Sequence, residues 1–296
     1  MGWVGASVAM STLHGGFVSE LLLNDVTEGL AEGEALDLGQ GVSFYPSARV
    51  RAASLDEMRD LDAVVIAAGR GGRPGQSRLD LLRDNVGMMR SVARSLRGLR
   101  GLMVVVTNPV DVLTQVATEA SGLPPERVIG TGTMLDTARL RQILGRELHI
   151  EARSIHAQVV GEHGDSEVVL WSGARAGGVG LRRWPGWSPE REQVLGDEVR
   201  TAAQEIIKRK GATNHAIGLV TAALLRWSLR GEGRVLTVSR VQTGACGIEG
   251  LALSLPAIVN RDGAVTVLEP DMDEGERAGL NASAEVLRRA HASIAE

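Results

Sequence analysis

Four short segments of this chain concentrate residue types that can do chemistry. They are a Gly- and Pro-rich loop with cations, an Asn-Pro turn, a Gly-Thr segment before a helix and a Gly-Glu-His-Gly segment, at 69–82, 106–111, 130–139 and 161–167. The imidazole of a histidine such as His163 titrates near neutral pH and can move protons. The guanidinium of an arginine such as Arg139 can bind a carboxylate through two hydrogen bonds. Taken singly, each segment also has a non-catalytic interpretation: a lone histidine is commonly a surface residue, Asp136 and Arg139 could be a solvated helix pair, and a Pro-Gly-rich loop is commonly only a loop.

The N-terminal end carries part of a dinucleotide-binding pattern. Gly2 and Gly5 precede a helical run at 6–15 and resemble the last two glycines of G-x-G-x-x-G, and a strand-like run at 20–24 is followed by Asp25. Such glycines let the backbone approach a pyrophosphate at a helix N-terminus, and Asp25 can accept hydrogen bonds from a ribose 2′-hydroxyl, which favours NAD over NADP. Two glycines before a helix are also typical of a simple turn. The first glycine and the strand before it are absent from the chain, and because that strand is central in such sheets, we expect a less stable fold and weaker cofactor binding.

The elements that must position these segments alternate between strand and helix over the first half. Three apolar runs predict strands buried on both faces, at 20–24, 63–67 and 102–106. Between the second and the third, the apolar spacing predicts a helix at 79–96. This alternation predicts a parallel sheet with right-handed crossovers. In the second half, the pattern predicts helices at 135–148 and 274–294 and an alternating run at 155–160. It also predicts two antiparallel strands at 235–239 and 251–255. We therefore predict an α/β protein, with a doubly wound parallel-sheet dinucleotide-binding domain at 1–129 that lacks its first strand, and an α/β substrate domain with an antiparallel sheet at 130–296.

The composition argues against several classes of protein. A formal net charge of −4 over 296 residues offers no basic field to a nucleic-acid backbone. The single cysteine, Cys246, permits no internal disulfide, and the first cation, Arg49, lies too far along the chain for a secretory signal. No apolar run approaches the roughly 20 residues of a membrane span, and no His/Cys cluster indicates a metal site. We expect a cytoplasmic protein without a metal or a nucleic-acid partner.

Together, the segments resemble the NAD-dependent L-lactate/malate dehydrogenase family, in its order and spacing from Gly2 to the C-terminus. The resemblance implies that His163 is the acid/base, that Asp136 holds its other ring nitrogen, and that Arg139 binds the substrate carboxylate. It also implies that Arg78 polarises the substrate carbonyl from a closing loop. Asn108 would hydrogen-bond the substrate oxygen, with a cis bond to Pro109 as in relatives.

The same resemblance implies the residues that contact the cofactor, NAD. They come from the N-terminal glycines, the acid after the second strand, the start of the loop and the ends of later strands: Gly2, Val4, Gly5, Asp25, Gly69, Arg70, Val106, Thr107, Asn108 and Thr131.

Substrate choice in this family depends on the residue before Arg73-Pro-Gly, which is glutamine in lactate enzymes and arginine in malate enzymes. Gly72 matches neither. Thr213 matches the small polar residue that lactate enzymes place beside the substrate methyl, so the resemblance favours pyruvate and L-lactate. The alternatives are L-malate or another 2-hydroxy acid, and a non-catalytic relative that has lost NAD binding. A family-4-type glycosidase also uses NAD, but it needs a metal held by Cys and His, and Cys246 alone does not supply that motif.

Two further residues predict regulation. Arg141 and His156 match the Arg and His with which bacterial members bind a sugar bisphosphate at a subunit interface. Arg141 lies two positions after Arg139, so it points away from the substrate side of the helix. We therefore expect a homotetrameric glycolytic enzyme that a bisphosphate such as fructose 1,6-bisphosphate activates.

Overall fold

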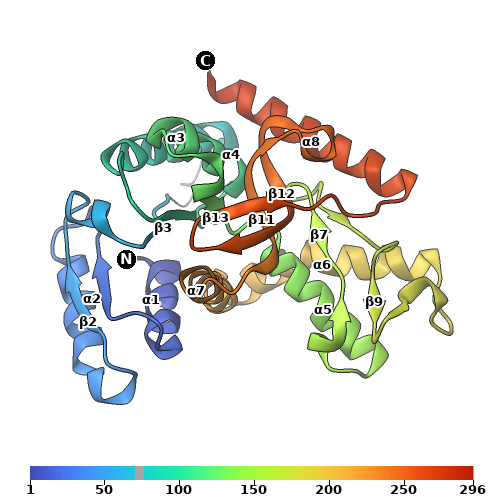
Figure 1. The fold of residues 1–296 in the computed structure, drawn as a ribbon, viewed down its shortest axis with the longest axis horizontal. Coiled ribbons are helices and arrows are strands. Elements are labelled where there is room, and N and C mark those ends of the chain that lie inside the picture. The colour runs from blue at the N-terminus through green and yellow to red at the C-terminus, as the bar shows by residue number, and fades with distance from the viewer. Residues whose placement is uncertain (71–76, 296) are drawn as a thin grey trace.

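A six-stranded sheet lies at the centre of the computed structural model, which describes residues 1–70 and 77–295 (Figure 1). Its strand order is β13-β12-β11-β5-β4-β3. These strands are β3 (Ala63–Ile66), β4 (Leu102–Val105), β5 (Val128–Gly130), β11 (Arg234–Thr243), β12 (Glu249–Asn260) and β13 (Gly263–Val267). Strands β3, β4 and β5 are parallel, whereas β11 joins β5 in antiparallel register through Ser239 and Gly130. The parallel sheet and the antiparallel sheet are therefore continuous.

Strand β4 shows why the parallel part forms where the apolar runs are. All four of its residues are buried, because helices cover both faces of the sheet. Met103 and Val105 belong to one core cluster, with α3 (Arg78–Ser95) and α4 (Val110–Ser121). Leu102 and Val104 belong to another, with α7 (His215–Leu229). Figure 1 shows α3 and α4 on one side of the sheet and α1 and α7 on the other.

The N-terminal elements form a separate unit beside this sheet. Strands β1 (Glu20–Leu23) and β2 (Arg49–Ala52) pair in parallel as a two-stranded sheet, flanked by α2 (Leu30–Gln40). In the described residues this two-stranded sheet is not hydrogen-bonded to the six-stranded sheet, of which β3 is an edge strand. Helix α1 (Trp3–Gly15) packs against α7 instead, where the Asn214 side chain donates to Ser7 Oγ at 2.9 Å. Gly218 permits this close approach, because a Cβ there would lie 2.8 Å from the Ser7 backbone.

Adding a strand before Met1 should stabilise this unit. A strand of about 6–8 residues would pair with the open edges of β1 and β3. It would also move the terminal ammonium of Met1 away from Asp25, with which it forms an ion pair. We expect tighter NADH binding and a gain in the free energy of unfolding on the order of 2 kcal/mol, or about 4–8 °C in Tm. Fluorescence titration with NADH and thermal melting compare the two chains. Equal NADH affinity and equal Tm in the two chains would contradict the expectation that an added strand pairs with β1 and β3.

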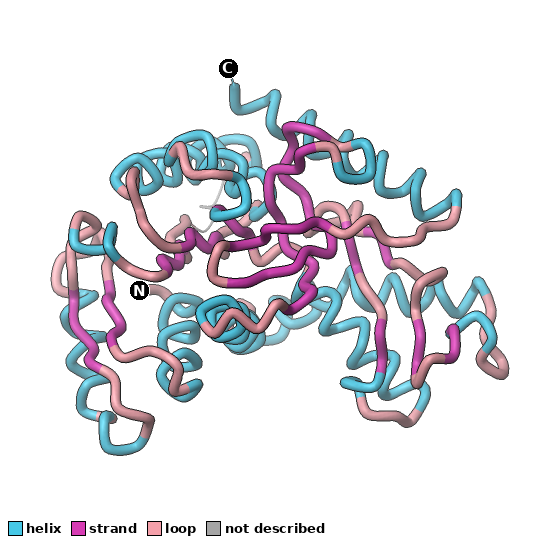
Figure 2. The backbone as a smooth tube through the Cα atoms, viewed as in Figure 1, coloured by secondary structure: helices cyan, strands magenta, loops and turns pink. Residues whose placement is uncertain are grey.

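The second half places its helices around small sheets (Figure 2). The helices are α5 (Met134–Leu148), α6 (Pro189–Lys210) and α8 (Glu274–Ala295). The short strands are β6 (Ile155–His156), β7 (Val159–Val160), β8 (Val168–Val169), β9 (Arg175–Ala176) and β10 (Val179–Gly180). Strands β6, β9 and β10 form one sheet, and β7 pairs with β8 in another. The alternating run predicted at 155–160 is thus not one strand: it breaks at residues 157–158 and serves two sheets.

None of the helices in the described ranges is both long and apolar enough to span a lipid bilayer.

Candidate active site

The loop that carries His163 begins at a glycine whose backbone is fixed by a distant strand. Gly161 follows β7 and exchanges two main-chain hydrogen bonds with Ser254 of β12, at 2.9 and 3.0 Å. Its φ of +87° favours glycine, and a Cβ there would lie 2.7 Å from the Ser283 hydroxyl. The next residue, Glu162, donates its main-chain N–H to the same Ser283 Oγ at 2.8 Å. The loop is therefore anchored to both β12 and α8 before it reaches His163.

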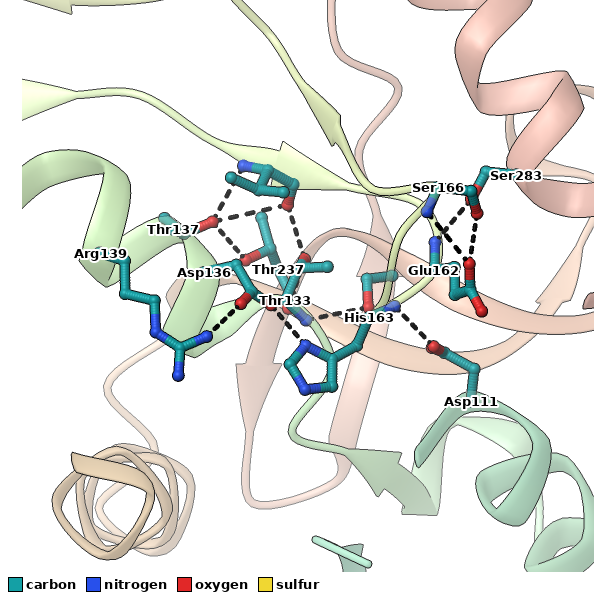
Figure 3. Close-up of polar contacts among 12 residues, drawn as sticks. Asp111, Thr133, Asp136, Thr137, Arg139, Glu162, His163, Ser166, Thr237 and Ser283 are labelled. Atoms are coloured by element: carbon teal, nitrogen blue, oxygen red, sulfur yellow. Dashed lines mark hydrogen bonds and ion pairs between the residues drawn. The ribbon is translucent and has the colours of Figure 1, made fainter. Parts of the chain in front are cut away.

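An imidazole–carboxylate pair forms the centre of the site (Figure 3). His163 Nδ1 lies 2.6 Å from Asp136 Oδ2, and Asp136 Oδ1 accepts a 2.7 Å hydrogen bond from Arg139. Asp136 and Arg139 come from consecutive turns of α5, where a spacing of three residues places them on one face. The Asp136 side chain is only 3% exposed, and the His163 side chain is 23% exposed. The structure thus brings together the three residues expected as the acid/base, its partner and the carboxylate ligand.

The pKa values of this pair follow from burial and charge. Burial disfavours the charged imidazole, but the hydrogen bond and the negative charge of Asp136 outweigh it, with a contribution from Asp111, and raise the pKa of His163 to about 9. Burial acts to raise the pKa of Asp136, and the hydrogen bond and charge of His163 outweigh it and lower that pKa. At neutral pH the ring is therefore an imidazolium with Nδ1 engaged. Its Nε2 proton remains available for transfer.

The ends of the parallel strands meet beside this pair. Thr107 Oγ1 donates to Ala68 O at 2.5 Å, which ties the end of β4 to the end of β3. Thr131 is buried, and its N–H donates to Val105 O at 3.0 Å, which ties β5 to β4. Val106 is buried beside them. Ligands of open α/β sheets bind at this carboxyl edge.

The Asn-Pro turn has the geometry that the resemblance implies. The peptide bond between Asn108 and Pro109 is cis. Asn108 is exposed at the end of β4, and α4 begins directly after Pro109.

The N-terminal unit has a cavity beside the acid that was expected to bind the cofactor ribose. A cavity of about 340 Å³ lies at the ends of β1 and β2 and is lined by Asn24, Asp25, Thr27, Glu28, Gly29, Ala31, Glu32, Ala52, Ala53 and Ser54. Gly2 caps α1, and a Cβ on it would meet no atom within 4 Å, so its backbone is open to a ligand. Val4 and Gly5 lie in the first turn of the same helix. These residues fit NAD, although Asp25 is paired with the Met1 ammonium.

The remaining expected residues lie in loops around this edge. Gly69 and Arg70 follow β3 and are exposed, and the Arg70 N–H donates to Asn85 Oδ1 at 2.8 Å. Arg78 is the first residue of α3, but its side chain and all of Gly72 lie outside the described residues. Thr213 is half-buried between α6 and α7. In the described part of the chain it makes no side-chain hydrogen bond to the His163 pair.

Two carboxyls near His163 were not expected from the sequence. Asp111 is 2% exposed, and its Oδ2 accepts the His163 main-chain N–H at 2.8 Å. Glu167 is 6% exposed, and burial together with the charge of Asp136 raises its pKa to about 8. Both lie within the chemistry-bearing segments, two residues after Pro109 and four after His163. Their place within these segments was the only signal that the sequence offered for them. Spacing along the chain does not report burial, so the sequence did not identify them as buried carboxyls near His163.

No group of three or more His, Cys, Asp or Glu side chains in the described ranges could hold a metal ion.

Comparisons with known proteins agree with this geometry. Residues 1–130 match the lactate/malate dehydrogenase NAD binding domain, and residues 133–296 match the lactate/malate dehydrogenase alpha/beta C-terminal domain. An L-lactate dehydrogenase of Synechococcus sp. is 40% identical over 99% of this chain and 97% of its own length. One of Geobacillus kaustophilus is 41% identical over 97% of this chain and 93% of its own.

Solved structures extend the likeness to the whole fold. The ligand-bound form of the minor L-lactate dehydrogenase of Enterococcus mundtii superposes with a TM-score of 0.97 at 36% identity, over 99% of this chain and 96% of that one. Its ligand-free form gives 0.91 at 35% identity, over 99% and 95%. The chain belongs to the lactate/malate dehydrogenase family and is an NAD-dependent oxidoreductase of 2-hydroxy acids.

Proposed function

We propose that the chain is an L-lactate dehydrogenase that reversibly converts pyruvate, NADH and a proton into L-lactate and NAD⁺. The observation that carries this proposal is the His163–Asp136–Arg139 cluster at the carboxyl edge of the parallel strands. Asp136 contacts both the proton donor His163 and the carboxylate-binding cation Arg139, so the three side chains lie in one place. The curated relatives at 40% and 41% identity are L-lactate dehydrogenases.

Each residue of the cluster has a separate task in the reduction of pyruvate. NADH, when bound, supplies the hydride. Arg139 binds the substrate carboxylate, and His163 Nε2 gives its proton to the keto oxygen. Asp136 keeps the ring oriented and stabilises the imidazolium. Asn108 and Arg78 polarise the carbonyl, and Thr213 lies beside the substrate methyl. In lactate oxidation the neutral His163 takes the hydroxyl proton.

An assay of NADH oxidation with pyruvate and with oxaloacetate tests this function. We expect a higher kcat/KM for pyruvate than for oxaloacetate. Fluorescence titration with NADH separates this from the alternative that the chain is a non-catalytic relative, because such a protein would give no enhancement. Enhancement without pyruvate reduction would contradict the assigned activity.

Substrate specificity should respond to changes at Gly72. Gly72→Arg should raise the oxaloacetate/pyruvate ratio of kcat/KM by at least about tenfold, because a cation would pair with the second carboxylate in a closed site. Gly72→Gln should shift the ratio toward pyruvate. Steady-state kinetics on both substrates measure the ratio. If neither change moves it, another position discriminates between the acids.

A cationic cluster on the far side of α5 supports a bisphosphate site. Arg141 is half-buried and donates from Nε to Ala157 O at 3.1 Å, away from the Asp136 face. Burial lowers its pKa. His156 is exposed, and Arg175 lies opposite it in the β6–β9 register. Fructose 1,6-bisphosphate is the proposed effector of a homotetramer, since anions between two such sets would offset their repulsion across a two-fold axis.

An exposed apolar face supports the assembly of several copies. Trp3 and Met10 of α1 and Leu219 of α7 are 65%, 47% and 64% exposed, and they line one groove of about 670 Å³. A monomer rarely leaves such a surface in water. Another copy of this chain is the proposed occupant.

Activation by bisphosphate can be measured directly. Millimolar fructose 1,6-bisphosphate should lower the pyruvate KM at both pH 6 and pH 7.5, because an anion would offset the repulsion between the cationic side chains at the interface. Arg141→Gln should remove most of the effect without changing kcat. Measurements of KM for both proteins at both pH values test this. A wild type that binds NADH but shows no activation at either pH would exclude the effector.

The cellular setting and the domain division are also proposals. The free Cys246 suits a reducing compartment, which supports a cytoplasmic enzyme of glycolysis. The division into an NAD-binding domain at 1–129 and a substrate domain at 130–296 falls at the end of β5, where parallel strands give way to antiparallel ones.

A further inference from the structure

A second buried carboxylate holds the acid/base loop from the side opposite to Asp136. Asp111 lies in the first turn of α4 and is 2% exposed. Its Oδ2 accepts the main-chain N–H of His163, 52 positions along the chain, at 2.8 Å. Figure 3 shows His163 between the two carboxylates, with its ring toward Asp136 and its main chain toward Asp111.

We propose that Asp111 is a positioning residue, which holds the main chain of His163 against the turn that carries Asn108 and places a second negative charge beside the imidazole. The proposal rests on the proposed function, because it assigns to Asp111 the alignment of the proton donor with a substrate-binding residue.

The anchors of the loop show what Asp111 adds. Gly161 is fixed by Ser254 of β12, and Glu162 is fixed by Ser283 of α8. Neither of these anchors belongs to the strand end that carries Asn108. Within residues 1–70 and 77–295, the hydrogen bond to Asp111 is the one that joins the loop backbone to the Asn108–Pro109 turn, three residues after Asn108. It also satisfies a main-chain donor that would otherwise lose its partner.

The charge of Asp111 acts on the imidazole as well. The groups that face His163 are Asp136 and Arg139 from α5 and Asp111 from α4. Glu167 of the same loop interacts electrostatically with both Asp136 and His163, and the charge of Glu162 acts to raise the pKa of Asp111. Asp136 contributes most to raising the pKa of His163 and Asp111 contributes the next most, whereas the charge of Arg139 lowers that pKa.

The carboxyl of Asp111 has a pKa within the pH range in which the reaction would be measured. Burial raises its pKa to about 6, while the Ser239 hydroxyl and the main chain and charge of His163 act in the opposite direction. Above that pH it carries the charge that favours the imidazolium.

Two substitutions separate the hydrogen bond from the charge. Asp111→Asn keeps an oxygen that can accept the His163 N–H but removes the charge. We expect its kcat near pH 6 to stay within about threefold of the wild type, while the fall of kcat/KM for pyruvate at high pH moves down by about one pH unit. Asp111→Ala removes both, so kcat should also fall by about tenfold or more through misplacement of the donor, with NADH affinity unchanged.

Glu119→Gln is the control, because it neutralises an exposed carboxylate on the same helix. Its pH profile should match that of the wild type. An unshifted profile for Asp111→Asn would overturn the charge role, and a wild-type kcat for Asp111→Ala would overturn the positioning role. If Asp111→Ala does not fold, Asp111→Asn still tests the proposal.

NMR titration of the His163 ring in the wild type and in Asp111→Asn makes the test independent of activity. A lower ring pKa in the variant supports the proposal even if the wild type does not reduce pyruvate. In that case the proposed function is wrong, but the role of Asp111 is not contradicted. An unchanged ring pKa contradicts the role of Asp111 and leaves the proposed function untouched.

Discussion

Replacing His163 with Ala is expected to lower kcat for pyruvate reduction by about 10³-fold, within the range that general acid–base groups contribute. The imidazole is the group whose free nitrogen can deliver a proton, because Nδ1 is engaged by Asp136 at 2.6 Å. The fold should persist, since Asp136 keeps its 2.7 Å ion pair with Arg139 and is not left as an unpaired buried charge. NADH affinity should also persist.

The measurement is kcat and kcat/KM in both directions over a range of pH. With a His163 pKa of about 9, reduction needs the imidazolium and should decline as the pH rises through that value, whereas lactate oxidation needs the neutral ring and should rise over the same interval. In His163→Ala both trends should vanish. His156→Ala, which removes an exposed histidine of β6, is the matched control and should keep them. Near-normal turnover in His163→Ala would remove His163 from the mechanism.

Replacing Arg139 with Lys is expected to lower kcat/KM for pyruvate by about 10²–10³-fold, mostly through KM. The guanidinium can hold the substrate carboxylate with two hydrogen bonds while it also contacts Asp136, and an ammonium cannot reproduce both contacts. A factor of about 10²–10³ corresponds to about 3–4 kcal/mol, the order expected when a charge-assisted hydrogen bond is lost in a site whose two charged side chains are 13% and 3% exposed.

Arg146→Lys is the control for this change. Arg146 lies on the same helix α5, but it is half-exposed and pairs with Glu198 at 2.8 Å on the surface. Its replacement should leave both constants within about twofold, because exposed ion pairs contribute little. A shift in KM for pyruvate confined to Arg139→Lys, with unchanged NADH fluorescence, assigns the carboxylate contact. Equal kinetics in the two variants would place the substrate carboxylate elsewhere.

The sequence by itself determined the local features of this protein. The run at 102–106 contains no polar residue until Thr107, which is sufficient to predict a strand covered on both faces, and β4 is buried throughout. The spacing of Asp136 and Arg139 fixes them on one helical face, and they form an i,i+3 ion pair. Such features depend on neighbours within one or two turns, so periodicity and motif spacing report them.

Elements that depend on distant partners were harder to predict. The sequence pattern predicted no element over the residues that form helices α6 and α7. The strands expected at 235–239 and 251–255 extend to ten and twelve residues, because their length is set by pairing with each other and with β5 and β13 rather than by their own apolar runs.

Only the tertiary structure decided how the site is assembled and how its groups titrate. His163 meets Asp136 across 27 positions and Asp111 across 52, and no spacing rule connects residues so far apart. The pKa values of about 9 for His163, about 6 for Asp111 and about 8 for Glu167 follow from burial and from charges on other elements. Desolvation and Coulomb interactions act through space and not along the chain, so these values exist only once the two halves have packed together.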